Sequence, residues 1–84
     1  MRILLVEDNL RLNELTTAAL RASGFAVDPA HGAGDAEAAL GDIAYDAIIL
    51  DLGLPDRDGM DLLNAIRRRR LATPVLLLTA RDDA

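Results

Sequence analysis

Four short apolar runs, joined by stretches of helical length, constrain the fold of this chain more than any other feature. The runs are residues 3–6, 25–27, 47–50 and 75–78. Each run is continuous rather than alternating, which is typical of strands covered on both faces in a parallel sheet. The connections are too long for hairpin turns and long enough for helical crossovers.

Each connection also carries a helical pattern. The apolar residues at helical spacing are Leu12, Leu15, Ala19 and Leu20, then Ala36, Ala39, Leu40 and Ile43, then Met60, Leu63 and Ile66. Asp8 or Asn9 could cap the first helix, which would end before Gly24. Strands and helices therefore alternate along the chain, and this order predicts an α/β domain with a right-handed, doubly wound parallel sheet.

Composition and charge exclude several classes of function. Fourteen acidic residues against nine basic ones give a net charge of −5, which argues against nucleic-acid binding by this segment. The absence of cysteine excludes disulfides and thiolate metal sites. No run approaches the roughly 20 apolar residues that a membrane span needs, so we expect no membrane association and a cytoplasmic location.

Acidic and hydroxyl side chains follow three of the four predicted strands. Glu7 and Asp8 come after the first strand, Asp51 after the third and Thr79 after the fourth. In an open parallel sheet, ligands bind beyond the carboxyl ends of the strands. We therefore expect these side chains to meet at one edge of the sheet.

Carboxylates gathered in this way repel one another, by about 1 kcal/mol at 4 Å in water and about 4 kcal/mol at an effective dielectric of 20. A bound cation removes that repulsion, and hard carboxylate oxygens suit Mg²⁺. A carboxylate beside Mg²⁺ can also attack phosphorus and form an acyl phosphate. An aspartate after a strand is equally often a helix cap or turn former, so the pattern alone leaves both interpretations open.

Three segments resemble the receiver domains of two-component response regulators. They are residues 3–9 (Ile-Leu-Leu-Val-Glu-Asp-Asn), 48–59 (Ile-Ile-Leu-Asp-Leu-Gly-Leu-Pro-Asp-Arg-Asp-Gly) and 74–80 (Pro-Val-Leu-Leu-Leu-Thr-Ala). The resemblance implies a flavodoxin-like receiver fold with strand order 2-1-3-4, in which the family's fifth strand and last two helices are absent. Residues 1–84 would then be a partial receiver (phosphoacceptor) domain. The second segment looks most like receivers joined to a winged-helix DNA-binding domain.

The resemblance also implies a role for each site residue. Asp51 would accept the phosphoryl group, while Thr79 and the backbone N–H of Ala80 would bind it. The implied Mg²⁺ ligands are Glu7, Asp8, Asp51 and the backbone carbonyl of Gly53, with Glu7 acting largely through water. The family's phosphate-binding lysine lies on the fifth strand, and this sequence contains no lysine.

The function implied is that of a signalling switch rather than an enzyme. A sensor histidine kinase would donate a phosphoryl group to Asp51, and the change would control an attached output domain that binds DNA; at most, the phosphoryl group would be lost slowly. One alternative is an interaction or dimerisation module with a vestigial acidic site. Another is a Mg²⁺-dependent phosphohydrolase of the haloacid-dehalogenase type, although Gly53 occupies the position of that family's second aspartate.

The fourth strand is predicted to form an unpaired edge of the sheet. Such an edge is a template for pairing with another chain. The first helix would also lack a packing neighbour and leave an apolar patch exposed. We therefore expect a homodimer, or an exchange of elements, through the edge of the fourth strand.

Overall fold

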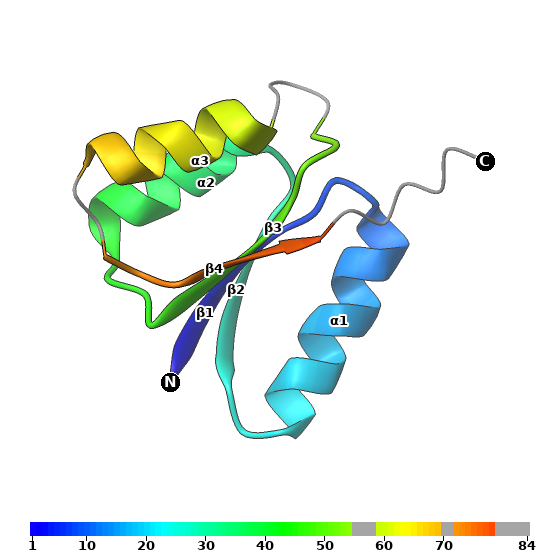
Figure 1. Cartoon of the computed structure of the whole chain (residues 1–84). Helices are drawn as coiled ribbons and strands as arrows, with labels where there is room; N and C mark the ends of the chain where they lie inside the picture. The colour runs from blue at the N-terminus through cyan, green and yellow to red at the C-terminus, as the bar shows by residue number, and fades with distance from the viewer. Residues whose placement is uncertain (55–58, 70–71, 79–84) are drawn as a thin grey trace.

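The computed structural model describes residues 1–54, 59–69 and 72–78, and it forms a four-stranded parallel sheet with helices on both faces (Figure 1). The elements are β1 (Arg2–Val6), α1 (Leu10–Ala22), β2 (Ala26–Ala30), α2 (Ala33–Asp42), β3 (Ala47–Asp51), α3 (Gly59–Arg68) and β4 (Val75–Leu78). The strand order is β2-β1-β3-β4, and all three pairings are parallel. The predicted doubly wound α/β fold, with its order 2-1-3-4, is confirmed.

Two apolar clusters cover the two faces of the sheet. Leu4 and Leu50 belong to the larger cluster, beneath α2 and α3, and they pack there with Leu62 of α3. Ile3 and Leu5 belong to the smaller cluster, on the side of α1 (Figure 1). Alternate residues of β1 thus point to opposite faces, as the pleat of a strand requires. Burial on both faces explains why this strand is a continuous apolar run.

The register of the two central strands determines where the acidic residues lie. Val6 of β1 is level with Leu50 of β3, so the chain leaves both strands at the same edge of the sheet. Glu7 follows β1 directly, and Asp51 is the last residue of β3. The backbone therefore brings the two carboxylates to neighbouring positions.

The second strand is longer than the sequence pattern predicted. The prediction ended at residue 27, whereas β2 continues through Asp28 and Pro29 to Ala30. Proline has no N–H to donate to a ladder, and β2 is the outermost strand on its side of the described sheet. The carboxylate of Asp28, which marked the end of the predicted strand, is hydrogen bonded by Arg2 and Tyr45.

The buried face of α1 is only partly apolar. Of the apolar residues found at helical spacing, Leu20 packs against the smaller cluster, whereas Leu12 and Leu15 have exposed fractions of 38% and 58%. Two polar residues of the helix, Asn13 and Thr17, are buried instead. The exposed leucines agree with the expectation of an uncovered apolar patch on this helix.

The buried face of α3 agrees with the predicted one except at its first turn. Met60 was predicted to face the core, but 43% of its surface is exposed. Gly59, Leu62 and Ile66 form the buried side of the helix. Ile66 is thus buried as predicted and Leu63 packs against the larger cluster, so the prediction was wrong for Met60 alone.

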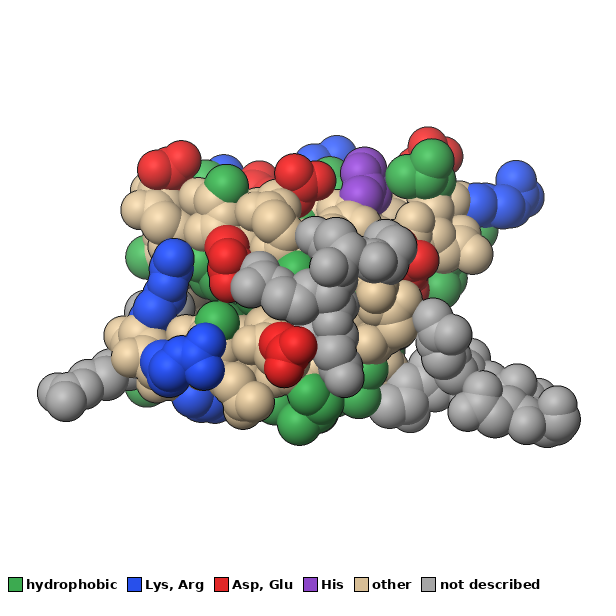
Figure 2. Space-filling model, turned by 90° about the horizontal axis from the view of Figure 1, so that it is seen from above, with side chains coloured by type: hydrophobic (Ala, Val, Ile, Leu, Met, Phe, Trp, Pro, Cys, Tyr) green, Lys and Arg blue, Asp and Glu red, His purple; other side chains and the backbone are tan. Residues whose placement is uncertain are grey.

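Among the described residues, no helix is long and apolar enough to cross a membrane. On the face seen in Figure 2, acidic and basic side chains are interspersed, and no continuous basic stripe crosses its described part.

Candidate functional site

Three carboxylates meet at the carboxyl edge of the sheet. Glu7, Asp8 and Asp51 each offer an oxygen atom, and these atoms all lie within 4.8 Å of one another. Glu7 and Asp51 are buried, while Asp8 is half-buried. The structure thus brings together the three acidic residues that the sequence predicted to be neighbours.

Burial, together with the neighbouring carboxyls, raises the pKa of Glu7. Its pKa is raised from 4.5 to about 7, chiefly because burial disfavours the charged form. The backbone N–H of Asn9, which donates to Glu7 Oε2 at 3.0 Å, lowers the pKa, whereas the nearby carboxyls of Asp51 and Asp8 raise it. The site therefore favours either a proton or a cation between its oxygens.

The side chain of Asp51 is oriented by the turn that follows it. Its Oδ1 accepts a hydrogen bond from the backbone N–H of Gly53 at 3.1 Å. Gly53, whose carbonyl is the fourth predicted ligand, therefore lies directly beside the acidic cluster. The backbone N–H of Leu52 donates to the carbonyl of Leu78 at 3.3 Å, which ties the same turn to the end of β4.

The cap of α1 separates a structural role from a candidate functional one. Asn9 Oδ1 accepts the backbone N–H of Leu12 at 2.9 Å, so Asn9 is the N-cap residue of the helix. The sequence left Asp8 and Asn9 as alternative caps. Since Asn9 fills that role, the carboxylate of Asp8 belongs to the acidic cluster instead.

Asn13 and Thr17 support the site in a way that the sequence did not predict. Asn13 Nδ2 donates to the backbone carbonyls of Glu7, at 3.0 Å, and Ala30, at 3.2 Å. Thr17 Oγ1 in turn donates to Asn13 Oδ1 at 3.1 Å. One buried amide thus ties the ends of β1 and β2 to α1. The available signal was a pair of polar residues four positions apart, on the face of α1 that also carries Leu20.

The donor set fits magnesium. All three side chains offer hard carboxylate oxygens, which suit Mg²⁺ better than a softer transition metal. The single histidine, His31, is exposed and is not part of the cluster. A divalent cation bound between the carboxylates would offset their mutual repulsion.

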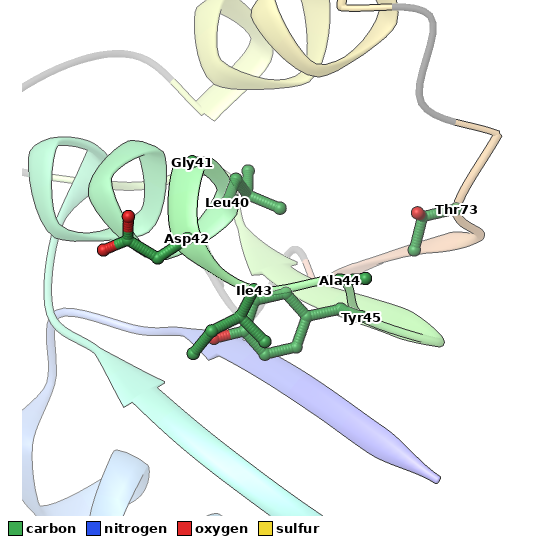
Figure 3. A pocket seen from close by; sticks show the side chains of 7 residues that line it. All are labelled: Leu40, Gly41, Asp42, Ile43, Ala44, Tyr45 and Thr73. Atoms are coloured by element: carbon green, nitrogen blue, oxygen red, sulfur yellow. The ribbon is translucent and has the colours of Figure 1, made fainter.

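A hollow in the surface lies at the end of β3 away from the acidic cluster. Its volume is about 290 Å³, and it is lined by residues 40–45 and by Thr73 (Figure 3). Tyr45 precedes β3, whereas Asp51 ends it, so the hollow shares no residue with the acidic cluster. Its lining is mostly apolar and holds one carboxylate, that of Asp42. The acidic cluster is therefore the better candidate for chemistry.

Comparison with known proteins decides the family. A family model described as the response regulator receiver domain matches residues 3–84. The chain belongs to this family. This assignment agrees with the fold and with the gathering of acidic residues, both of which were predicted from the pattern of strands.

Relatives of this receiver domain include transcriptional regulators. The chain is 48% identical over 82 residues to the transcriptional regulatory protein PmrA of Pectobacterium parmentieri, and it covers 37% of that protein's length.

Solved receiver structures agree with this chain in fold. The non-phosphorylated HemR receiver domain of Leptospira biflexa has a TM-score of 0.89 and 38% identity, with 99% of this chain and 67% of that chain covered. The response regulator TrrA of Thermotoga maritima, solved in complex with Mg²⁺-BeF, has a TM-score of 0.89 and 31% identity, with 96% and 70% covered.

Two predicted site residues, Thr79 and Ala80, lie outside the described residues. Their roles in binding a phosphoryl group stay predictions. Within the described part of this receiver, the candidate site consists of Glu7, Asp8 and Asp51, with Gly53 beside them.

Proposed function

We propose that this receiver accepts a phosphoryl group on Asp51 from a sensor histidine kinase, with Mg²⁺ held by Glu7, Asp8, Asp51 and the Gly53 carbonyl. The observation that carries the proposal is the meeting of three carboxylates within 4.8 Å, at the carboxyl edge of a parallel sheet, in a chain of the receiver family. One of the three, Asp51, ends β3 and is oriented by the Gly53 N–H.

The transfer is a displacement at phosphorus. An oxygen of the Asp51 carboxylate attacks the phosphorus of phosphohistidine, the P–O bond of an acyl phosphate forms, and the P–N bond breaks. The imidazole leaves with the electron pair of that bond. When bound, Mg²⁺ would neutralise charge on the phosphoryl oxygens. Glu7 and Asp8 would hold the cation, while the Gly53 N–H fixes the rotation of the attacking carboxylate. Thr79 and the Ala80 N–H would bind the transferred group.

The relatives support the proposed partners. The name of PmrA describes a transcriptional regulatory protein, and this chain covers 37% of its length. We propose that the change at Asp51 controls an attached DNA-binding output domain in the cytoplasm, and that this segment makes no DNA contact of its own.

The solved TrrA structure contains Mg²⁺ and BeF, which supports Mg²⁺ as the cation. We propose no catalysis beyond slow loss of the phosphoryl group.

Self-association through β4 also stays a proposal. Leu76 and Leu77 of this strand are 60% and 39% exposed, and in the described residues β4 pairs only with β3. An exposed apolar edge strand favours pairing with a second copy of the chain. Sedimentation equilibrium should show dimers that a Leu76→Lys substitution weakens; a monomer at all concentrations would contradict the proposal.

The phosphoacceptor proposal is tested with a small phosphodonor. The chain is incubated with acetyl phosphate, with and without Mg²⁺, and intact mass is followed beside Asp51→Asn. We expect one phosphoryl adduct that requires Mg²⁺ and is absent from the variant. An adduct that persists in Asp51→Asn would show that another residue is the acceptor, and the assignment of Asp51 would be wrong.

A further inference from the structure

The first residue of α3 lies directly against the backbone that carries Asp51. Gly59 is buried, and its N–H donates to the carbonyl of Leu52 at 3.1 Å. A Cβ atom built on Gly59 would lie 2.5 Å from the Cα of Leu52 and 2.9 Å from the carbonyl oxygen of Asp51. Both are backbone atoms, so no flexible side chain could turn aside to make room.

Glycine is required at this position for space rather than for an unusual backbone conformation. The glycine with a left-handed conformation among the described residues is Gly24, with a φ of 98°. Gly59 is the opening residue of a regular helix. What its missing side chain permits is the close approach of α3 to the turn after β3.

That turn sets the position of two proposed Mg²⁺ ligands. Leu52 is held on one side by its N–H bond to Leu78 and on the other by the Gly59 N–H. The next residue, Gly53, donates to Asp51 Oδ1 and carries the carbonyl proposed as a ligand. Because the backbone is continuous, displacing Leu52 displaces the Gly53 N–H and carbonyl as well, and with them the rotation of the Asp51 carboxylate.

We propose that Gly59 is a positioning residue of the acidic site: it lets α3 clamp the turn 51–53 so that the Asp51 carboxylate and the Gly53 carbonyl face one cation. This inference rests on the proposed function. Gly59 touches neither the cation nor the phosphoryl group and acts only through Leu52 and Gly53. A substitution should therefore change metal affinity and phosphorylation together.

Two other glycines provide matched controls. A Cβ atom on Gly41, within α2, would meet no atom within 4 Å. A Cβ atom on Gly24 would also meet none, but its left-handed backbone makes alanine strained there. Gly41→Ala tests the bare effect of an added methyl group in a helix. Gly24→Ala tests a general loss of stability that does not involve the site.

The experiment compares Gly59→Ala, Gly41→Ala and Gly24→Ala with the unaltered chain. Isothermal titration calorimetry gives the dissociation constant for Mg²⁺, intact mass gives the rate of adduct formation with acetyl phosphate, and thermal melts give stability. We expect Gly59→Ala to weaken Mg²⁺ binding about tenfold, the lower end of the range for residues that support metal ligands, and to slow the adduct. Gly41→Ala and Gly24→Ala should bind Mg²⁺ as the unaltered chain does, even though Gly24→Ala melts earlier.

A second measurement does not depend on how the variant folds. In the unaltered chain, hydrogen exchange of the Gly59 and Gly53 amides is followed with and without Mg²⁺. We expect both amides to gain protection together, because the Gly59 N–H binds Leu52 and Leu52 is joined directly to Gly53. Protection at Gly53 with no change at Gly59, or unchanged Mg²⁺ affinity in folded Gly59→Ala, would overturn the inference and leave the proposed function intact. Absence of both Mg²⁺ binding and adduct in the unaltered chain would instead overturn the proposed function, and this inference with it.

Discussion

The two halves of the acidic site are held by different means. On the β1 side, the Glu7 carboxylate accepts the backbone N–H of Asn9, and the Glu7 backbone carbonyl accepts the side-chain amide of Asn13. On the β3 side, Asp51 is fixed by the backbone N–H of Gly53, in a turn packed against Gly59. The backbone of the β1 half is therefore supported by a polar side chain, that of Asn13, and the backbone of the β3 half by the absence of a side chain at Gly59. Each carboxylate is oriented by the backbone N–H two residues further along the chain, and the two halves differ in what holds that backbone in place.

The largest expected effect is that of removing a carboxylate from the β1 half. Asp8→Asn keeps the size of the side chain but removes its charge, and Asn9 still caps α1. We expect Mg²⁺ affinity to fall about 100-fold and adduct formation to slow with it. Calorimetric titration with Mg²⁺ measures the first and intact mass the second. If affinity were equal in the two chains, Asp8 would not be a ligand.

Removing the amide that supports the β1 half should have the next largest effect. Asn13→Leu removes the side-chain donor to the buried carbonyl of Glu7, one of two donors to the carbonyl of Ala30, and the acceptor of the Thr17 hydroxyl. We expect a loss of about 2–3 kcal/mol in the free energy of unfolding and about tenfold in Mg²⁺ affinity. Urea unfolding and calorimetry measure the two quantities.

Thr17→Val is the matched control for that substitution. It removes one hydroxyl but keeps the bonds from Asn13 to Glu7 and Ala30. Stability should fall by about 1 kcal/mol, with Mg²⁺ affinity unchanged. If both variants altered Mg²⁺ affinity equally, Asn13 would act through general packing of α1 rather than through the carbonyl of Glu7.

The smallest effect is expected far from the site, where pH dependence can be assigned to one group. The pKa of Asp28 is lowered from its ordinary 3.8, first by the Tyr45 hydroxyl, which donates to Oδ2 at 2.7 Å, and also by Arg2. A lowered carboxyl pKa contributes stability above pH 3.8 that is lost as the pH falls through the folded-state value. The unaltered chain should therefore lose more stability on acidification than Tyr45→Phe.

Urea unfolding at pH 7 and near pH 3 measures that difference. At pH 7, Tyr45→Phe should be less stable by about 1 kcal/mol, because it lacks a hydrogen bond to a partly exposed carboxylate. The difference in free energy of unfolding between the unaltered chain and Tyr45→Phe should become smaller at the lower pH. If that difference were the same at both pH values, the Tyr45 hydroxyl would not stabilise the charged form of Asp28.

Much of the fold could be predicted because its strongest signals are local. Strands buried on both faces must be apolar throughout, so residues 3–6 and 47–50 identified the two central strands. The acids at their ends then followed from topology, since parallel strands deliver their carboxyl ends to one edge. Glu7, Asp8 and Asp51 could thus be placed together without any knowledge of side-chain contacts.

The rest depended on partners that are distant in sequence. Asp28 lies within β2 because Arg2 and Tyr45 bind its carboxylate, and neither is visible from the local pattern. Asn13 is buried because its amide meets two strand-end carbonyls, whereas a polar helical residue ordinarily predicts an exposed position. The close approach of Gly59 to Leu52 likewise has no signature beyond a glycine near a turn.

The most direct test of a single site built from two halves is a Mg²⁺ titration of the chain followed by two-dimensional amide NMR. The account predicts that the amides of residues 7–9, on the β1 side, and of residues 51–53, on the β3 side, shift together with one dissociation constant. Asp51→Asn should weaken both sets of shifts equally. Shifts confined to one half, or two halves that titrate with different constants, would contradict the account.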